Sequence, residues 1–244
     1  MLTTLVFGSI GTLVETSELQ RQAFNEAFAE AGLAWDWHTE LYQQLLSVPG
    51  GRSRIQLFAE QQGAPLEEAA VASLHERKSE LYQGKLRAGE LELRPGVARL
   101  LREALDNGVQ VGLASGTSAA NIQAISDAVG DALPLKEFAV VIDASSEANP
   151  KPAPDVYELC LKALGAHASE AVAVEDSAVS LDSAVAAGLV TVATPGAYVA
   201  HQDFSAASAV LPDLDSPAAL RSPVAVPAGG VTLGWLRALV DAQS

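Results

Sequence analysis

Basic residues are scarce in this chain. Fifteen lysines and arginines stand against 30 aspartates and glutamates in 244 residues, which gives a formal net charge of −15 at pH 7. A charge of this sign and size repels nucleic acid and anionic lipid at long range. We therefore expect no nucleic-acid partner and no membrane partner.

Cysteine and long apolar runs are also missing. The single cysteine, Cys160, can form no internal disulfide. No apolar run reaches the roughly 18 residues of a membrane span, and no basic flank precedes an apolar signal segment at the N-terminus. These absences favour a globular protein in a reducing, cytoplasmic setting, and they leave a mature organellar form open.

What the chain does contain is an alternation of short apolar runs with helical patterns. Strand-sized apolar runs occur at residues 2–7, 109–114, 138–142, 171–174 and 189–193. Such runs are typical of strands buried on both faces of a parallel sheet. Amphipathic helices are predicted at about 97–107, 118–129, 154–165 and 177–187, with Ser118 and Ser177 as N-caps. The pattern predicts an α/β fold with a doubly wound parallel sheet.

A long insertion separates the first predicted strand from the second. It has helical periodicity at residues 18–31, 40–46, 55–62 and 67–85 and no strand pattern. Because it leaves the core near the carboxyl edge of the sheet, where such folds bind ligands, we expect a helical cap over the site. The predicted organisation is a core at 1–14 and 94–211, a cap at 15–93, and an appended tail at 212–244 with a short helix at 233–242.

Polar residues follow the ends of several predicted strands. These segments are Gly8-Ser9-Ile10-Gly11-Thr12, Ser115, Lys151-Pro152 and Glu175-Asp176-Ser177. In this order they resemble the four motifs of the haloacid-dehalogenase superfamily. Further segments resemble the CbbY-type sugar-phosphate phosphatases, which are close to β-phosphoglucomutases: Glu15-Thr16, Gln22-Ala23-Phe24-Asn25, Gly50-Gly51-Arg52-Ser53-Arg54-Ile55, Leu93-Arg94-Pro95-Gly96, Lys151-Pro152-Ala153-Pro154-Asp155 and Pro195-Gly196-Ala197-Tyr198.

The resemblance implies a Rossmann-like core, a Mg²⁺-dependent aspartate nucleophile and a second aspartate, two residues further on, as acid and base. It also implies phosphate contacts from Ser115, Gly116 and Lys151, and metal contacts from Glu175 and Asp176. The residue types suit these tasks, because a lysine neutralises phosphate oxygens and carboxylates bind a hard cation. Each residue also has a structural alternative: a surface lysine, an N-cap serine, and an aspartate stabilised by a helix dipole.

The first motif departs from the family pattern. Gly8 stands at the position of the nucleophile and Ile10 at that of the acid and base. Neither side chain can attack phosphorus or move a proton, and the loss at position 8 also removes an expected metal ligand, so any Mg²⁺ site is weakened. The exposed amides of residues 8–11 offer an alternative as a weak anion cradle. Ser17 and Gln20 stand where the family often has an acidic residue and a histidine.

The predicted cap carries a basic turn. Gly51, Arg52 and Arg54 open a helix, and guanidinium groups match phosphate oxygens in pairs. We expect them to bind a distal phosphate of the substrate, as the family resemblance implies. The alternative is that both arginines pair with surface carboxylates. Tyr42, Arg94 and His201 are lesser candidates.

Two functions compete. The favoured hypothesis is a catalytically silent phosphatase homologue that binds a small phosphorylated sugar or a protein partner. The alternative is a working Mg²⁺-dependent phosphatase of small phosphorylated sugars, such as a pentulose bisphosphate, with an unusual nucleophile. Ser9 is a poor substitute, because strand alternation should turn it away from the face used by positions 8 and 10. A third reading is that the two replacements were engineered to trap a ligand.

Overall fold

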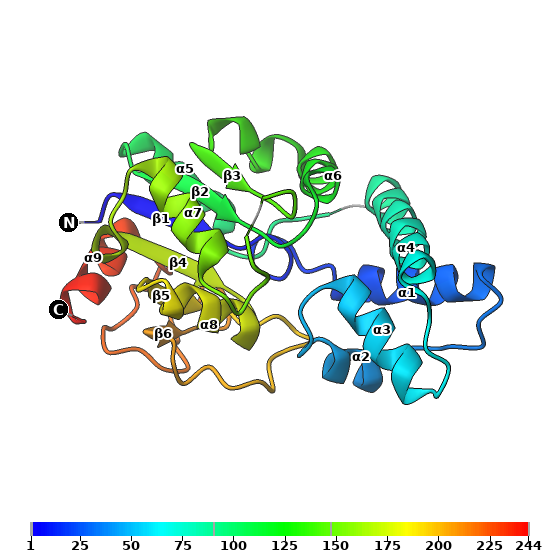
Figure 1. Ribbon diagram of the computed structural model, residues 1–244. Helices are drawn as coiled ribbons and strands as arrows, with labels where there is room; N and C mark the ends of the chain where they lie inside the picture. The colour runs from blue at the N-terminus through cyan, green and yellow to red at the C-terminus, as the bar shows by residue number, and fades with distance from the viewer. Residues whose placement is uncertain (1, 90, 147, 244) are drawn as a thin grey trace.

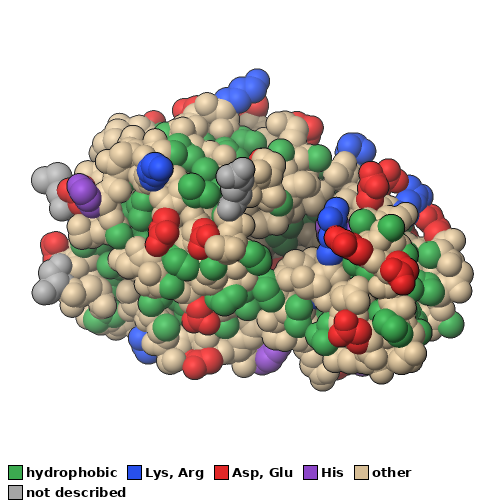
Figure 2. All heavy atoms as spheres, viewed as in Figure 1, with side chains coloured by type: hydrophobic (Ala, Val, Ile, Leu, Met, Phe, Trp, Pro, Cys, Tyr) green, Lys and Arg blue, Asp and Glu red, His purple; other side chains and the backbone are tan. Residues whose placement is uncertain are grey.

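The protein has two parts that lie side by side (Figure 1). A computed structural model describes residues 2–89, 91–146 and 148–243. One part is an α/β core that contains both ends of the chain, and the other is a helical cap made of α1 to α4. The surface is hollowed where core and cap meet, and basic and acidic side chains lie next to each other at the cap's rim of this hollow (Figure 2).

The core is built on one parallel sheet with the strand order β3-β2-β1-β4-β5-β6. Phe7 at the end of β1 lies opposite Leu113 of β2 and Val174 of β4. The carboxyl ends of these three strands therefore lie next to each other, and the predicted doubly wound α/β fold is confirmed. The strands are β1 Thr4–Phe7, β2 Gln110–Ala114, β3 Val140–Ile142, β4 Ala171–Glu175, β5 Val190–Ala193 and β6 Ala209–Val210.

Helices cover both faces of the sheet. Successive residues of a strand point to opposite faces, so Leu5 and Phe7 pack with side chains of α5, α6 and α9, whereas Val6 packs with α7 and α8. This double cover explains why the central strands are apolar throughout. The core helices are α5 Val97–Asp106, α6 Ala119–Val129, α7 Asp155–Leu164, α8 Ala178–Ala186 and α9 Leu233–Asp241, with short 3₁₀ turns at Gly130–Ala132, Leu135–Glu137 and Ala168–Glu170.

The cap holds most of the large rings of a chain in which aromatic residues make up only 5%. Phe24 and Phe28 on the first cap helix pack against Trp37, with ring centroids 4.5 and 4.9 Å apart. These contacts give the cap a core of its own. The cap helices are α1 Ser17–Glu30, α2 Thr39–Leu45, α3 Gly51–Gln61 and α4 Glu68–Ala88.

Most predicted helices lie within a few residues of their observed bounds. Ser118 is confirmed as an N-cap, since its hydroxyl accepts a hydrogen bond from the Asn121 amide at 3.3 Å. Ser177 precedes α8, but its side chain makes no capping bond there with the described residues. The helix predicted at 55–62 begins earlier, at Gly51, because Gly50, with φ of 84°, makes the turn into it.

The tail is more than the appendage that we expected. Leu233, Trp235 and Leu236 of α9 are buried in the same cluster as β1 and β2. Upstream of the helix, Arg99 donates to the backbone oxygens of Leu214 and Val231. The tail therefore completes one face of the core. Over the described ranges, no helix has both the length and the apolar composition that crossing a bilayer requires.

Candidate active site

The predicted motif residues meet at the carboxyl edge of the sheet. Gly8 follows β1, Ser115 follows β2, and Glu175 ends β4. Because β1 lies between β2 and β4, these three positions are neighbours. Lys151 reaches the same place from the loop before α7.

Gly8 leaves no room for a side chain in the present arrangement. A Cβ at this position would lie 2.7 Å from Thr12 Oγ1 and 2.8 Å from the carboxyl carbon of Glu175. The side chain of Glu175 thus fills the space beside Gly8 where a nucleophile would begin. The backbone amide of Gly8 donates to the Val174 oxygen at 3.1 Å, so it is already part of the sheet.

Glu175 is bonded to several protein donors. Its Oε1 lies 2.7 Å from Lys151 Nζ and also accepts a bond from the Tyr157 hydroxyl, while Oε2 accepts from Thr12 Oγ1 at 3.3 Å. The Glu175 side chain is 1% exposed and that of Lys151 is 11% exposed. Burial makes such a pair depend on good geometry and full hydrogen bonding, which this one has.

Ser115 and Lys151 line one small cavity, as the phosphate prediction requires. The cavity has a volume of about 140 Å³ and also touches Gly116 and Asp143. Ser9 is nearly buried, and its hydroxyl lies 2.6 Å from Ser115 Oγ. A Cβ on Gly8 would point at Glu175 and Thr12, whereas the Ser9 hydroxyl meets Ser115, so positions 8 and 9 face different neighbours.

Asp176 lies at the start of the segment that leads into α8. Its carboxylate occupies the place of a Cβ on Gly11, a residue whose φ of 84° suits glycine. Desolvation and the negative charge of Glu175 raise the pKa of Asp176 to about 8. Thr12 Oγ1 donates to its Oδ1 at 3.4 Å.

The donor set fits Mg²⁺ poorly. Mg²⁺ needs near-octahedral oxygen ligands with help from carboxylates. Here Gly8 offers no side chain, Ile10 packs against the main apolar cluster, and Glu175 is bonded to Lys151. Among the described residues, no three acidic, histidine or cysteine side chains group closely enough to hold a metal ion.

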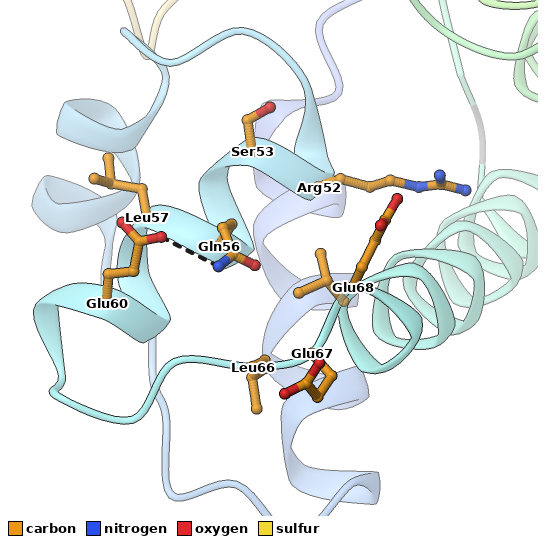
Figure 3. Close-up of a pocket in the computed structure, with 9 residues that line it drawn as sticks. Arg52, Ser53, Gln56, Leu57, Glu60, Leu66, Glu67 and Glu68 are labelled. Atoms are coloured by element: carbon orange, nitrogen blue, oxygen red, sulfur yellow. Dashed lines mark hydrogen bonds between the residues drawn. The ribbon is translucent and has the colours of Figure 1, made fainter.

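The structure separates the two arginines of the cap. Arg52 is exposed and lines a groove of about 550 Å³ between α3 and α4, where its side chain extends past Glu68 (Figure 3). Arg54 is partly buried and donates to the Val48 oxygen at 2.8 Å. Gly51 is needed for close packing, since a Cβ there would lie 2.5 Å from the His75 ring.

Two basic residues beside Arg54 were missed by sequence reasoning. Lys78 is 4% exposed and lies over the rings of Phe24 and Tyr82, at 4.7 and 5.0 Å from their centroids. Burial and the nearby Arg54 lower the pKa of Lys78 to about 7. The pKa of His75 falls to about 4, chiefly through burial and then through Lys78.

A sequence signal for Lys78 did exist. It falls on the apolar stripe of α4, whose other buried members are Val71, Leu74, Tyr82 and Leu86. A lysine at helical spacing within such a stripe is rarely left buried without a specific reason. Its Nζ donates to Oε1 of Gln20, the residue that stands where the family often has histidine.

Tyr198 connects the core to the cap, and Arg94 holds the loops around the site. Tyr198, after β5, donates to Glu18 of α1 and packs edge-on against Tyr42, with ring centroids 6.0 Å apart. Arg94 donates to backbone oxygens of Gly11, Thr194, Pro195 and Pro212, so it supports the loops around the site. His201 is exposed.

The comparisons with known proteins agree with this architecture. A model of the haloacid dehalogenase-like hydrolases matches residues 2–188, most of the chain. The chain therefore belongs to the haloacid dehalogenase-like hydrolase family. Within that family it is a CbbY homologue: Protein CbbY of Rhodobacter capsulatus is 41% identical over 217 residues, which cover 89% of this chain and 96% of that protein.

A second relative, the plasmid-encoded Protein CbbY of Cupriavidus necator, is 41% identical over 88% of this chain and 86% of its own length. A crystal structure of mutant CbbY from Rhodobacter sphaeroides in complex with xylulose-(1,5)bisphosphate matches with a TM-score of 0.83 at 37% identity, over 87% of this chain and 95% of that one. β-Phosphoglucomutase from Clostridium difficile matches with a TM-score of 0.78 over 100% of this chain and 99% of that one; its 16% identity bears on the fold alone.

Proposed function

We propose that this chain is a catalytically silent CbbY homologue that binds a small phosphorylated sugar. The observation that carries the proposal is the environment of Gly8, where the Glu175 carboxylate fills the space beside a residue with no side chain. Loss of the nucleophile in another covalent enzyme lowers turnover about a million-fold. Ile10 in addition leaves no acid or base two residues further on.

Binding can outlast catalysis because the groups that contact phosphate differ from those that react. Ser115, Gly116 and Lys151 line one cavity in the core. In the cap, Arg54 lies near Lys78, whose pKa burial and that neighbouring charge lower, and we propose these two residues as contacts for a second phosphate of the ligand. The complex of Rhodobacter sphaeroides CbbY with xylulose-(1,5)bisphosphate supports a pentulose bisphosphate as the ligand class. A cytoplasmic setting is part of the proposal.

An assay of phosphate release tests whether the protein lacks phosphatase activity. The purified protein with Mg²⁺ should release no phosphate above background from a panel of phosphorylated sugars, including xylulose 1,5-bisphosphate. Metal-dependent release that follows the protein through purification, and that disappears in Asp176→Asn, would overturn the proposal.

Calorimetry tests the binding. Xylulose 1,5-bisphosphate should bind saturably, and Lys151→Ala should weaken it, whereas the exposed Lys162→Ala on α7 serves as the matched control and should not. Absence of heat at millimolar ligand would leave a protein partner as the remaining role.

A working sugar-phosphate phosphatase is the second candidate. The identity of 41% with Protein CbbY over most of both chains favours it. It requires a nucleophile other than residue 8, so the phosphate-release assay separates the two candidates directly.

A further inference from the structure

We infer, on the basis of the proposed sugar-phosphate binding, that this cleft holds its phosphate group without a divalent cation, and that the hydroxyl of Ser9 belongs to the site. No family feature assigns a role to this serine. Its placement, together with the bonds made by the surrounding carboxylates, supports both halves of the inference.

The carboxylates that remain are poorly available to a cation. Glu175 already accepts bonds from Lys151, Tyr157 and Thr12, and its side chain is 1% exposed. Turning Glu175 toward a metal would strip Lys151 of its buried partner, which carries a large energetic penalty. Asp176 would then be the main protein carboxylate of a Mg²⁺ site, which is too few for tight binding.

The charge balance of the cleft also removes the need for a cation. Aspartates at positions 8 and 10 would place two negative charges beside that of Glu175, and a divalent cation would have to offset them before a phosphate could approach. Gly8 and Ile10 remove both charges together. Without the aspartates and without the cation, the net charge of the cleft stays the same, and Lys151 remains its positive group.

Ser9 supplies a hydrogen-bond donor in this setting. Its hydroxyl and that of Ser115 lie 2.6 Å apart, and Ser115 Oγ also accepts from the Thr117 amide at 3.1 Å. The two hydroxyls carry two hydrogens, and their mutual bond uses one. The bonds found among the described residues leave the second hydrogen without an acceptor, next to the cavity that Ser115 and Lys151 line.

A phosphate oxygen in that cavity is the acceptor that the pair lacks. A nearly buried donor without an acceptor costs about 1–3 kcal/mol, so a ligand that satisfies it gains affinity. Ser9 is 8% exposed and Ser115 is 4% exposed. The pair thus replaces part of the polar environment that a metal-bound carboxylate would otherwise provide.

The test is calorimetry of inorganic phosphate and of xylulose 1,5-bisphosphate, each with a chelator and with millimolar Mg²⁺. We expect the two dissociation constants for each ligand to agree within about twofold, and Ser9→Ala to raise them about tenfold. Ser9→Thr keeps the hydroxyl and should bind like the wild type. Ser145→Ala is the matched control, because Ser145 is exposed and is not among the residues that line the cavity.

The outcomes separate this inference from the function on which it rests. Affinity that rises tenfold or more with Mg²⁺ overturns the cation-free site, and a folded Ser9→Ala that binds like Ser145→Ala overturns the role of Ser9. If neither ligand binds under any condition, the proposed sugar-phosphate function fails, and the inference fails with it.

Discussion

Two nearly buried lysines, one in the core and one in the cap, are held in opposite ways. Lys151 lies 2.7 Å from a carboxylate, that of Glu175, and its charge is matched. Lys78 donates to the neutral amide of Gln20 and lies over two aromatic rings. Within the described residues, no carboxylate forms an ion pair with Lys78.

The difference shows that burial alone does not decide what a lysine does. In the core, the pair is electrically complete, so a ligand must compete with Glu175 for Lys151. In the cap, burial and then the nearby charge of Arg54 lower the pKa of Lys78.

The largest expected effect is on phosphate release, and it comes from two substitutions in the core that do not alter the cap. Gly8→Asp with Ile10→Asp should produce Mg²⁺-dependent phosphate release at least about a hundredfold above the wild type, because nucleophile and acid/base act as a unit. The new Asp side chain must displace Glu175 from beside Gly8. Phosphate release with and without Mg²⁺ measures the gain.

Each single variant is the control for this repair, and each should give little activity. Burial of a new carboxylate among the apolar neighbours of Ile10 opposes folding unless metal binds. A folded double variant that binds Mg²⁺ without turnover would show that the loss of catalysis extends beyond residues 8 and 10, for instance to Ser17 and Gln20.

A large stability effect should separate the two lysines. Lys151→Met should lower the free energy of unfolding by about 3 kcal/mol, because it leaves Glu175 charged, buried and unpaired. Lys78→Met should cost much less, since it removes a charge that burial disfavours. Denaturant titrations of both variants measure the difference. Adding Glu175→Gln to Lys151→Met should recover most of the loss; equal losses for the two single variants would contradict the comparison.

The pH dependence should carry the signature of Lys78. Its folded pKa, about 7, lies below the unfolded value of 10.5. The unfolded chain therefore binds more protons between these values, and the Lys78 contribution to stability rises with pH through that window and is lost as pH falls toward 7. From pH 7 to 9 the gain should be about 2 kcal/mol. Subtracting the stability–pH profile of Lys78→Met from that of the wild type isolates this gain. Identical profiles would contradict the lowered pKa of Lys78.

The smallest expected effect concerns the contact between core and cap. Tyr198→Phe removes the hydroxyl that donates to Glu18 but keeps the ring against Tyr42. Because the Glu18 side chain is 44% exposed, the loss of stability should be below about 1 kcal/mol. Amide hydrogen exchange in α1 should become faster than in the wild type, while exchange in α5 should not change. Unchanged exchange in α1 would show that this contact does not hold the cap.

The sequence predicted the fold well where burial is symmetrical. Central strands such as residues 4–7 are covered on both faces, so they consist of apolar runs that are easily recognised in the sequence. The two-residue strand β6 was missed because it is too short to form a pattern. The role of α9 was missed because its partners, Leu5 and Val111 among them, lie far away in the chain.

The candidate site was predictable only in part. Ser115, Lys151 and Glu175 come together as expected, since strand ends of a parallel sheet share one edge. Glu175 pairs with Lys151, and Ser9 faces Ser115. Both contacts depend on side-chain geometry, which residue spacing does not encode. The separation of Arg52 from Arg54 has the same cause.

The burial of α9 beside β1 also affects the order in which the core and the cap can fold during synthesis. Leu2, Leu5 and Phe7 are synthesised long before Leu233 and Leu236, with which they share a cluster. The cap helices all lie between residues 17 and 88, so the buried members of the cap cluster are available much earlier, and only Tyr198 joins them later. During synthesis the cap can therefore fold before α9 has emerged to pack beside β1.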